Sequence, residues 1–180
     1  MIVHSVLGSG SFGVVFLATK GKVEVAIKRF RAPLCRLGEK ARGRRGREKK
    51  AQSVEVRECR ALQRVVGVSH CVQLLGSFST PDGRARYIIM EYCSGGSLRG
   101  RVREGGAVGL VKAKAWLLQL LAALSFLHSR GLVHRDVKPG NVLVGHGDRN
   151  LRLADFGCAK RAGSGNAFVV CESRGSEKVL

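Results

Sequence analysis

The sequence feature that most constrains the fold is GSGSFGVVFLATK, residues 8–20, in which three glycines have the G-x-G-x-x-G spacing. This spacing occurs in two unrelated nucleotide-binding designs. A dinucleotide-binding turn needs a helix after the glycines, because the pyrophosphate binds at the helix N-terminus. Here the glycines precede VVFLAT and, after a Lys-Gly-Lys turn, VEVAIKRF. Both runs favour strands, so we expect a β-hairpin. An ordinary glycine-rich turn and a flap that closes over phosphates both fit this pattern.

The first half of the chain is predicted to form an antiparallel sheet. Short β-rich runs are separated by Gly, Pro and Asp, which favour turns. These runs are residues 2–8, 13–19, 23–30, 71–78 and 87–92.

One helix is expected between the third and fourth of these runs, within residues 52–66. Its apolar residues recur at helical spacing and form one face, and Glu58 falls on that same face. The apolar residues are Val54, Ala61, Leu62 and Val65. A buried carboxylate needs a partner. The residues alone leave two alternatives, a partner elsewhere in the fold or a half-exposed Glu58 paired with Arg57 or Arg60.

The chain is strongly basic, with 32 Lys and Arg against 13 Asp and Glu and a formal net charge of +19. This surplus favours polyanionic partners without choosing among them. Much of it lies in residues 31–50, which have no apolar face and are expected to form a solvated loop. A nuclear-localisation or nucleic-acid-binding patch is the alternative. Nucleic acid is not favoured as a partner, because no aromatic residues interleave with these charges.

The second half changes to a helical pattern after residues 94–98. Residues 112–129 are apolar on nearly every side, so this helix is expected to be surrounded by other helices. No apolar run is judged long enough to span a membrane, and the N-terminus does not resemble a signal peptide. We therefore expect an intracellular protein, in the cytoplasm and also the nucleus. The six cysteines contain no C-x-x-C pair, which favours reduced thiols over a zinc site.

Two motifs follow that helix, GLVHRDVKPGNVLV at residues 131–144 and RLADFGCAK at residues 152–160. They supply acids at Asp136 and Asp155, an amide at Asn141, and a cation at Lys138. Phosphoryl transfer needs this set: a base for a hydroxyl, a cation near the phosphate, and oxygen ligands for Mg²⁺. Together with the glycine motif and the earlier A-I-K, these ordered motifs resemble the eukaryotic protein kinase family along the whole chain.

The resemblance implies an α+β fold with two lobes. Residues 1–91 would form a complete antiparallel β N-lobe with one helix, including the basic loop at 31–50. Residues 92–98 would form the hinge. Residues 99–180 would form a partial helical C-lobe, because the A-P-E motif and later helices of the family are not found. A C-terminally truncated domain is therefore expected.

The resemblance also implies catalytic residues. Asp136 would be the catalytic base, and Lys138 would neutralise the γ-phosphate. Lys28 would hold the α- and β-phosphates, with Glu58 as its ion-pair partner and Glu55 as the fallback.

ATP and Mg²⁺ are the implied cofactors. Asn141 and Asp155 would be the metal ligands. The residues expected to bind the nucleotide are Gly8, Gly10, Gly13, Val15, Ala26, Lys28, Met90, Glu91, Cys93 and Leu143.

Finer features suggest the class of kinase. Lys138 is the serine/threonine form of the catalytic loop, and LLGSF, MEYCSGGSL, DFGCAKR and ESRGS resemble MAP kinase kinase kinases, particularly those of plants. The implied partner is a protein substrate such as a downstream MAP kinase kinase. Arg135 is typical of kinases whose activation segment is ordered by phosphorylation, here with candidates Ser164, Ser173 and Ser176. The alternative is a truncated, inactive fragment that binds nucleotide or a partner without transferring phosphate.

Overall fold

The computed structural model describes residues 1–10, 13–30, 54–81 and 85–162. Several sequence-based predictions concern residues outside these ranges: the basic segment 31–50, Cys35, Cys171 and the candidate phosphorylation sites Ser164, Ser173 and Ser176.

A five-stranded antiparallel sheet forms the N-terminal part, in the order β1-β2-β3-β5-β4. Its strands are β1 (Ile2–Gly10), β2 (Gly13–Lys20), β3 (Val23–Phe30), β4 (Leu74–Ser79) and β5 (Arg86–Glu91). The predicted sheet is therefore confirmed. The β1–β2 hairpin pairs Gly10 with Gly13 next to the turn. A Cβ at Gly13 would collide with the carbonyl oxygen of Arg29, so only glycine fits there.

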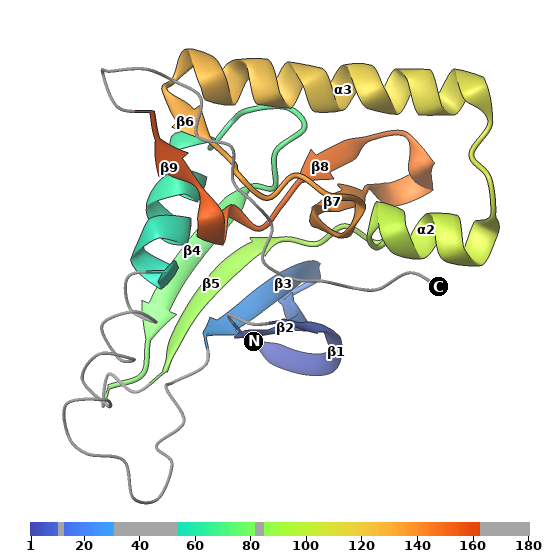
Figure 1. Cartoon of the computed structure of the whole chain (residues 1–180). Coiled ribbons are helices and arrows are strands. Elements are labelled where there is room, and N and C mark those ends of the chain that lie inside the picture. Colours follow the sequence, from blue (N-terminus) through green and yellow to red (C-terminus); the bar gives the residue numbers. More distant parts are fainter. Residues whose placement is uncertain (11–12, 31–53, 82–84, 163–180) are drawn as a thin grey trace, which may run out of the picture.

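Residues 54–64 form the predicted helix, which we call the N-terminal helix; it is drawn without a label in teal in Figure 1. Its inner face is the predicted one: Val54, Glu58, Ala61 and Leu62 are buried, and Val65 is buried just beyond the helix. Glu58 is only 1% exposed, so a half-exposed Glu58 paired on the surface was the wrong alternative.

The described residues of the C-terminal part form two α-helices, α2 (Leu98–Gly105) and α3 (Leu110–Ser129). Short antiparallel pairs follow, β7 (Val142–Val144) with β8 (Leu151–Leu153) and β6 (Leu132–Val133) with β9 (Lys160–Arg161). Three short 3-10 helices lie between these strands: η1 (Pro139–Asn141), η2 (His146–Asp148) and η3 (Phe156–Cys158). In Figure 1 the β7–β8 hairpin lies between α3 and the large sheet.

One continuous hydrophobic core joins the two parts. It contains Leu62 from the N-terminal helix, Ile88 from β5, Leu127 from α3, and Leu153 and Phe156 from the segment after β7, each at most 1% exposed. Because close-packed cores resist deformation, this core fixes the β7–β8 hairpin against the sheet.

Helix α3 differs from its prediction in two ways. Its buried residues are Trp116, Ala123 and Leu127, whereas Leu118 is 64% and Leu121 is 51% exposed. Within the described ranges one face is covered, and no set of helices surrounds it. The helix also has 20 residues, and its most apolar 18-residue window has a mean hydropathy of 1.5, so by length and composition it could cross a membrane, contrary to the sequence-based expectation. Core helices of soluble proteins can have the same length and composition, so this is weak evidence for a membrane span.

Candidate active site

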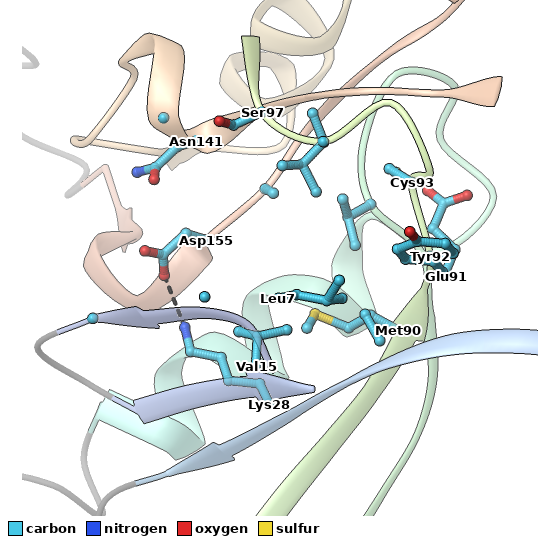
Figure 2. A pocket seen from close by; sticks show the side chains of 18 of the residues that line it. Leu7, Val15, Lys28, Met90, Glu91, Tyr92, Cys93, Ser97, Asn141 and Asp155 are labelled. Atoms are coloured by element: carbon cyan, nitrogen blue, oxygen red, sulfur yellow. Dashed lines mark hydrogen bonds and ion pairs between the residues drawn. The ribbon is translucent and has the colours of Figure 1, made fainter. Parts of the chain in front are cut away.

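Lys28 lies at the centre of a buried charge cluster. It is in the middle of β3, where it is paired with Ile88 of β5. Its Nζ donates to both carboxylate oxygens of Glu58 at 2.7 Å and to Oδ1 of Asp155 at 3.0 Å. Figure 2 shows the Lys28–Asp155 contact across the cleft. The fold thus joins three charges from the sheet, the N-terminal helix and the segment after β8.

The electrostatics of this cluster follow from its burial. Burial alone would lower the pKa of Lys28, but the charges of Glu58 and then Asp155 outweigh it and raise that pKa. Burial raises the pKa of Glu58, against the opposing effect of Lys28. Burial would also raise the pKa of Asp155, but Lys28 outweighs it and lowers that pKa. Lys28 therefore stays charged and holds Asp155 ionised.

A local backbone bend aims Asp155 into the cleft. Asp155 has a left-handed φ of 61°, and the next residue, Phe156, is completely buried. The Phe156 ring packs edge-on against His134 with the ring centroids 4.9 Å apart. Gly157 follows, and a Cβ there would lie 3.3 Å from Glu58 Oε2. The buried phenylalanine anchors this segment, and the glycine lets it approach the N-terminal helix closely.

The loop after β6 holds Asp136 in a fixed orientation. Asn141 donates from Nδ2 to Oδ2 and to the backbone oxygen of Asp136, each at 2.9 Å. Lys138 Nζ lies 2.8 and 3.0 Å from the two carboxylate oxygens of Asp136. Since Asp136 accepts hydrogen bonds from a cation and an amide, its carboxylate is orientated as well as charged.

His134 connects this loop to the backbone beside Asp155. The Asp136 amide donates to its Nδ1 at 3.3 Å, so Nε2 carries the proton and donates to the Ala154 carbonyl at 3.0 Å. Burial lowers the pKa of His134, which agrees with a neutral ring. Next to it, Arg135 has a φ of 66° and donates from Nε to the Cys158 carbonyl at 2.7 Å. These bonds tie the Asp136 loop to the Asp155 segment.

The donor set suits a hard divalent cation. Asn141 turns its amide nitrogen to Asp136, which leaves its side-chain oxygen as an acceptor, and Figure 2 shows Asn141 and Asp155 on the same side of the cleft. Carboxylate and amide oxygens are ligands that Mg²⁺ accepts. Among the described residues, no group of three or more His, Cys, Asp and Glu side chains could hold a metal, so this pair would need further oxygens from a ligand or water.

These side chains meet at a cleft of about 440 Å³ between the sheet and the β7–β8 hairpin. Gly8 and Gly10 have open space where a Cβ would stand, as the close approach of a ligand to the backbone requires. Asp136 and Lys138 do not line the cleft itself; they adjoin it through Asn141. The predicted residues that line it are Gly8, Gly10, Gly13, Val15, Ala26, Lys28, Glu58, Met90, Glu91, Cys93, Asn141, Leu143 and Asp155.

Some lining residues were not predicted. They are Leu7, Ser9, Val72, Tyr92, Ser94, Gly96, Ser97, Gly140 and Ala154. Leu7, directly before the first glycine, could have been found from its place next to the motif. Val72 lies in a run that was assigned to a strand, and nothing local marks it as facing the cleft. The fallback Glu55 is not beside Lys28; its carboxylate lies 3.2 Å from Arg86.

Glu91 is tied to both parts of the molecule, a feature that sequence reasoning missed. Its Oε1 accepts from the backbone amide of Gln73 and from Nε of Arg152 in β8, each at 3.0 Å. Gln73 in turn caps three carbonyls after the N-terminal helix, at residues 65, 68 and 71. The edge of the cleft at Glu91 is therefore held by polar contacts on two sides. Nearby, burial raises the pKa of the Cys93 thiol to about 12, so it is neutral.

Comparison with known proteins agrees with this geometry. The protein kinase domain family model matches residues 1–177. The chain is 31% identical to serine/threonine-protein kinase PKH2 of Saccharomyces cerevisiae, covering 87% of this chain and 13% of that protein. It is 34% identical to the probable serine/threonine-protein kinase zyg-1 of Caenorhabditis elegans, covering 88% and 20%. It is 31% identical to human protein kinase C delta type, covering 94% and 24%.

The chain thus spans less than a quarter of the length of these relatives. The family model nevertheless covers nearly all of it, and the two-lobe α+β arrangement with its cleft is the one expected from the ordered motifs. The chain belongs to the protein kinase domain family.

Proposed function

We propose that this chain binds Mg²⁺-ATP in the cleft and forms part of a protein serine/threonine kinase that transfers the γ-phosphate to Ser and Thr hydroxyls. The observation that carries this proposal is Lys28, buried between Glu58 and Asp155 with 2.7 and 3.0 Å contacts. A lysine fixed in this way is preorganised to meet phosphate oxygens, because its position costs nothing further when the nucleotide binds.

The nucleotide would lie with its base between apolar walls and its phosphates under the glycine hairpin. Ala26 and Leu143 line the cleft from opposite lobes, and Met90 and Cys93 line its inner edge. Lys28 would contact the α- and β-phosphates. Magnesium bound by Asn141 and Asp155 would neutralise the phosphate charge.

Asp136 is assigned the role of the base that orients the substrate hydroxyl and accepts its proton. Its carboxylate is orientated by Asn141 and Lys138, the two neighbours described above. Lys138 is exposed and close to Asp136, so it can move to a phosphate oxygen when one is present. Lys138 is also the serine/threonine form of the catalytic loop, which supports Ser and Thr hydroxyls as the acceptors of the phosphate.

The finer proposal places the protein in a MAP kinase cascade, as a MAP kinase kinase kinase of the plant type. Its support is the resemblance of LLGSF, MEYCSGGSL and DFGCAKR to that subfamily. The substrate would be a MAP kinase kinase, and the location would be the cytoplasm, with the nucleus as a second site.

Calorimetry with ATP tests the first proposal. Chelation of Mg²⁺ and the substitution Asp155→Ala should each weaken ATP binding, because the carboxylate and metal act together on the phosphates. Glu24→Gln, an exposed change in β3, is the matched control and should bind as the unchanged chain does. ATP affinity that is insensitive to both metal and Asp155 would refute the assignment.

A phosphate-transfer assay tests the second. Labelled ATP is offered with a MAP kinase kinase and with a generic basic protein, and Asp136→Asn should reduce incorporation by about 10²–10⁴. Metal-dependent ATP binding without Asp136-dependent transfer would instead identify a non-catalytic nucleotide-binding protein. Equal use of both substrates would remove the MAP kinase cascade from the proposal.

A further inference from the structure

A second cavity lies away from the nucleotide cleft. It has a volume of about 660 Å³, and none of its lining residues lines the first. We call it the α2–α3 groove. It is lined by Arg101, residues 105–112, Ala115, Trp116, Asp148 and Arg149.

The floor of the groove is rigid. Trp116 is 5% exposed, and its indole Nε1 donates to the backbone oxygen of Asp148 at 3.2 Å. One turn further along α3, Gln119 donates to the Arg149 carbonyl at 3.0 Å and accepts from the Leu151 amide at 2.7 Å. These bonds fix α3 to the β7–β8 turn, so the groove is already formed in the free chain.

The polar rim of the groove is basic. Arg101 Nε lies 3.0 Å and Lys112 Nζ 3.4 Å from the same oxygen of Asp148. Arg149 is exposed beside them. The lining of the groove thus contains one carboxylate and three cations, so the rim has a surplus of positive charge in a chain whose net charge is already +19.

The rest of the rim is aliphatic. Leu110 is 81% and Val111 85% exposed, and both line the groove together with Val108. Exposed aliphatic residues beside unbalanced cations are complementary to a ligand that carries carboxylates and aliphatic side chains together. A nucleic acid would meet the cations but would leave these aliphatic groups without a partner. In addition, Trp116 is buried in the floor, so it offers no open ring face for a base to stack on.

We propose that the α2–α3 groove is a docking site for a partner protein, which it binds through an acidic segment containing aliphatic residues. The carboxylates of the segment contact Lys112, Arg149 and Arg101, and its aliphatic side chains cover Leu110 and Val111. The site does not depend on ATP binding or on phosphate transfer, because it shares no lining residue with the cleft.

The test uses the 180-residue chain and a fluorescein-labelled twelve-residue peptide of alternating Glu and Leu. Trp116 is the chain's single tryptophan, so its intrinsic fluorescence reports occupancy of the groove directly. We expect saturable binding that changes the Trp116 emission and weakens as salt is raised. A peptide with Lys in place of Glu and one with Ser in place of Leu should both bind at least about tenfold more weakly.

The variant is the double charge reversal Lys112→Glu with Arg149→Glu, which should weaken the Glu-Leu peptide by about tenfold or more. The matched control is Lys20→Glu with Lys22→Glu, which makes the same change in net charge at the exposed β2–β3 turn. Circular dichroism checks folding, and Lys112→Gln with Arg149→Gln replaces the reversal if it unfolds.

Three results would overturn the proposal. The first is a control variant that loses as much affinity as the groove variant, which would show attraction by net charge alone. The second is a twelve-residue oligothymidylate that binds as tightly and is weakened equally by the groove reversal, which would make the groove a nucleic-acid site. The third is no saturable binding of the Glu-Leu peptide up to about 1 mM, a limit that corresponds to only about 4 kcal/mol.

Discussion

Two helices of this chain each break the rule that polar side chains are exposed and apolar ones buried. The helix of residues 54–64 places the carboxylate of Glu58 in the interior, 1% exposed. Helix α3, with 20 residues and far more hydrocarbon, leaves Leu118 64% and Leu121 51% exposed. Hydrophobicity alone would predict the opposite, with the two leucines buried and the glutamate exposed.

The difference shows that burial here depends on what lies opposite each residue. Glu58 faces Lys28, which donates to both of its oxygens, so its desolvation is offset by a charged partner. Trp116 and Leu127 face the β7–β8 hairpin and the core, whereas Leu118 and Leu121 have no element packed over them among the described residues.

Breaking the buried ion pair should have the largest effect on stability. Lys28→Met leaves the carboxylates of Glu58 and Asp155 together without a cation, which should cost about 3–5 kcal/mol in the free energy of unfolding. Adding Glu58→Leu removes the stranded charge and should restore most of that loss. Chemical denaturation of the single and double variants measures both. A single variant as stable as the parent chain would mean that Lys28 does not compensate Glu58.

Within α3, two identical truncations should differ sharply. Leu127→Ala removes a completely buried side chain and should cost about 2–5 kcal/mol, because the cavity cannot fully close. Leu118→Ala removes an exposed one and should change stability by less than about 0.5 kcal/mol. Thermal and chemical unfolding of the pair measure this contrast. Similar costs at both positions would show that the outer face of α3 is covered in solution.

Acidification should act through His134, a buried base whose two hydrogen bonds are to the backbone of Ala154 and Asp136. Burial lowers the pKa of this ring in the folded chain, whereas in the unfolded chain its pKa is about 6.5. The unfolded state therefore binds more protons, and the free energy of unfolding falls as the pH drops below about 6.5, until the folded ring also titrates.

Asp136, Asp155 and Lys138 also act on this ring, the two acids favouring its charged form and the lysine opposing it. His134→Gln should therefore flatten the pH dependence of stability between about pH 7.5 and 5.5, whatever its effect on absolute stability. Urea titrations at several pH values compare the two slopes. An unchanged slope in the variant would assign the pH dependence to other groups.

Much of the fold was accessible from sequence because it is specified locally. The β-branched runs and their glycine turns predicted the five strands within a few residues, and the apolar spacing predicted the buried face of residues 54–64. The ordered motifs likewise named Lys28, Asp155 and Asn141, which the fold brings to one cleft.

Long-range contacts were not accessible. The bond from Arg152 to Glu91 joins residues 61 apart, and neither has a local pattern that marks the other. The exposure of α3 depends on which elements pack over it, and its own hydrophobicity cannot report that. The same holds for the α2–α3 groove, which forms only where α2, α3 and the β7–β8 turn meet.

The weakest of these comparisons concerns Glu55, one turn before Glu58 on the same helix. Residues three apart on a helix are neighbours on its surface, so Glu55 and Glu58 start close together. Glu55 nevertheless contacts Arg86 at 3.2 Å, with 35% of the arginine side chain exposed. Water screens such a pair, so Glu55→Gln should cost about 0.2–1 kcal/mol in the free energy of unfolding. Glu58→Gln should cost more, because it removes the charge from a fully desolvated bond to Lys28. Chemical denaturation of the two amide variants side by side measures this difference. A larger loss for Glu55→Gln would mean that the helix is rotated in solution, with Glu55 facing Lys28, and would remove the basis for assigning Glu58 to the cleft.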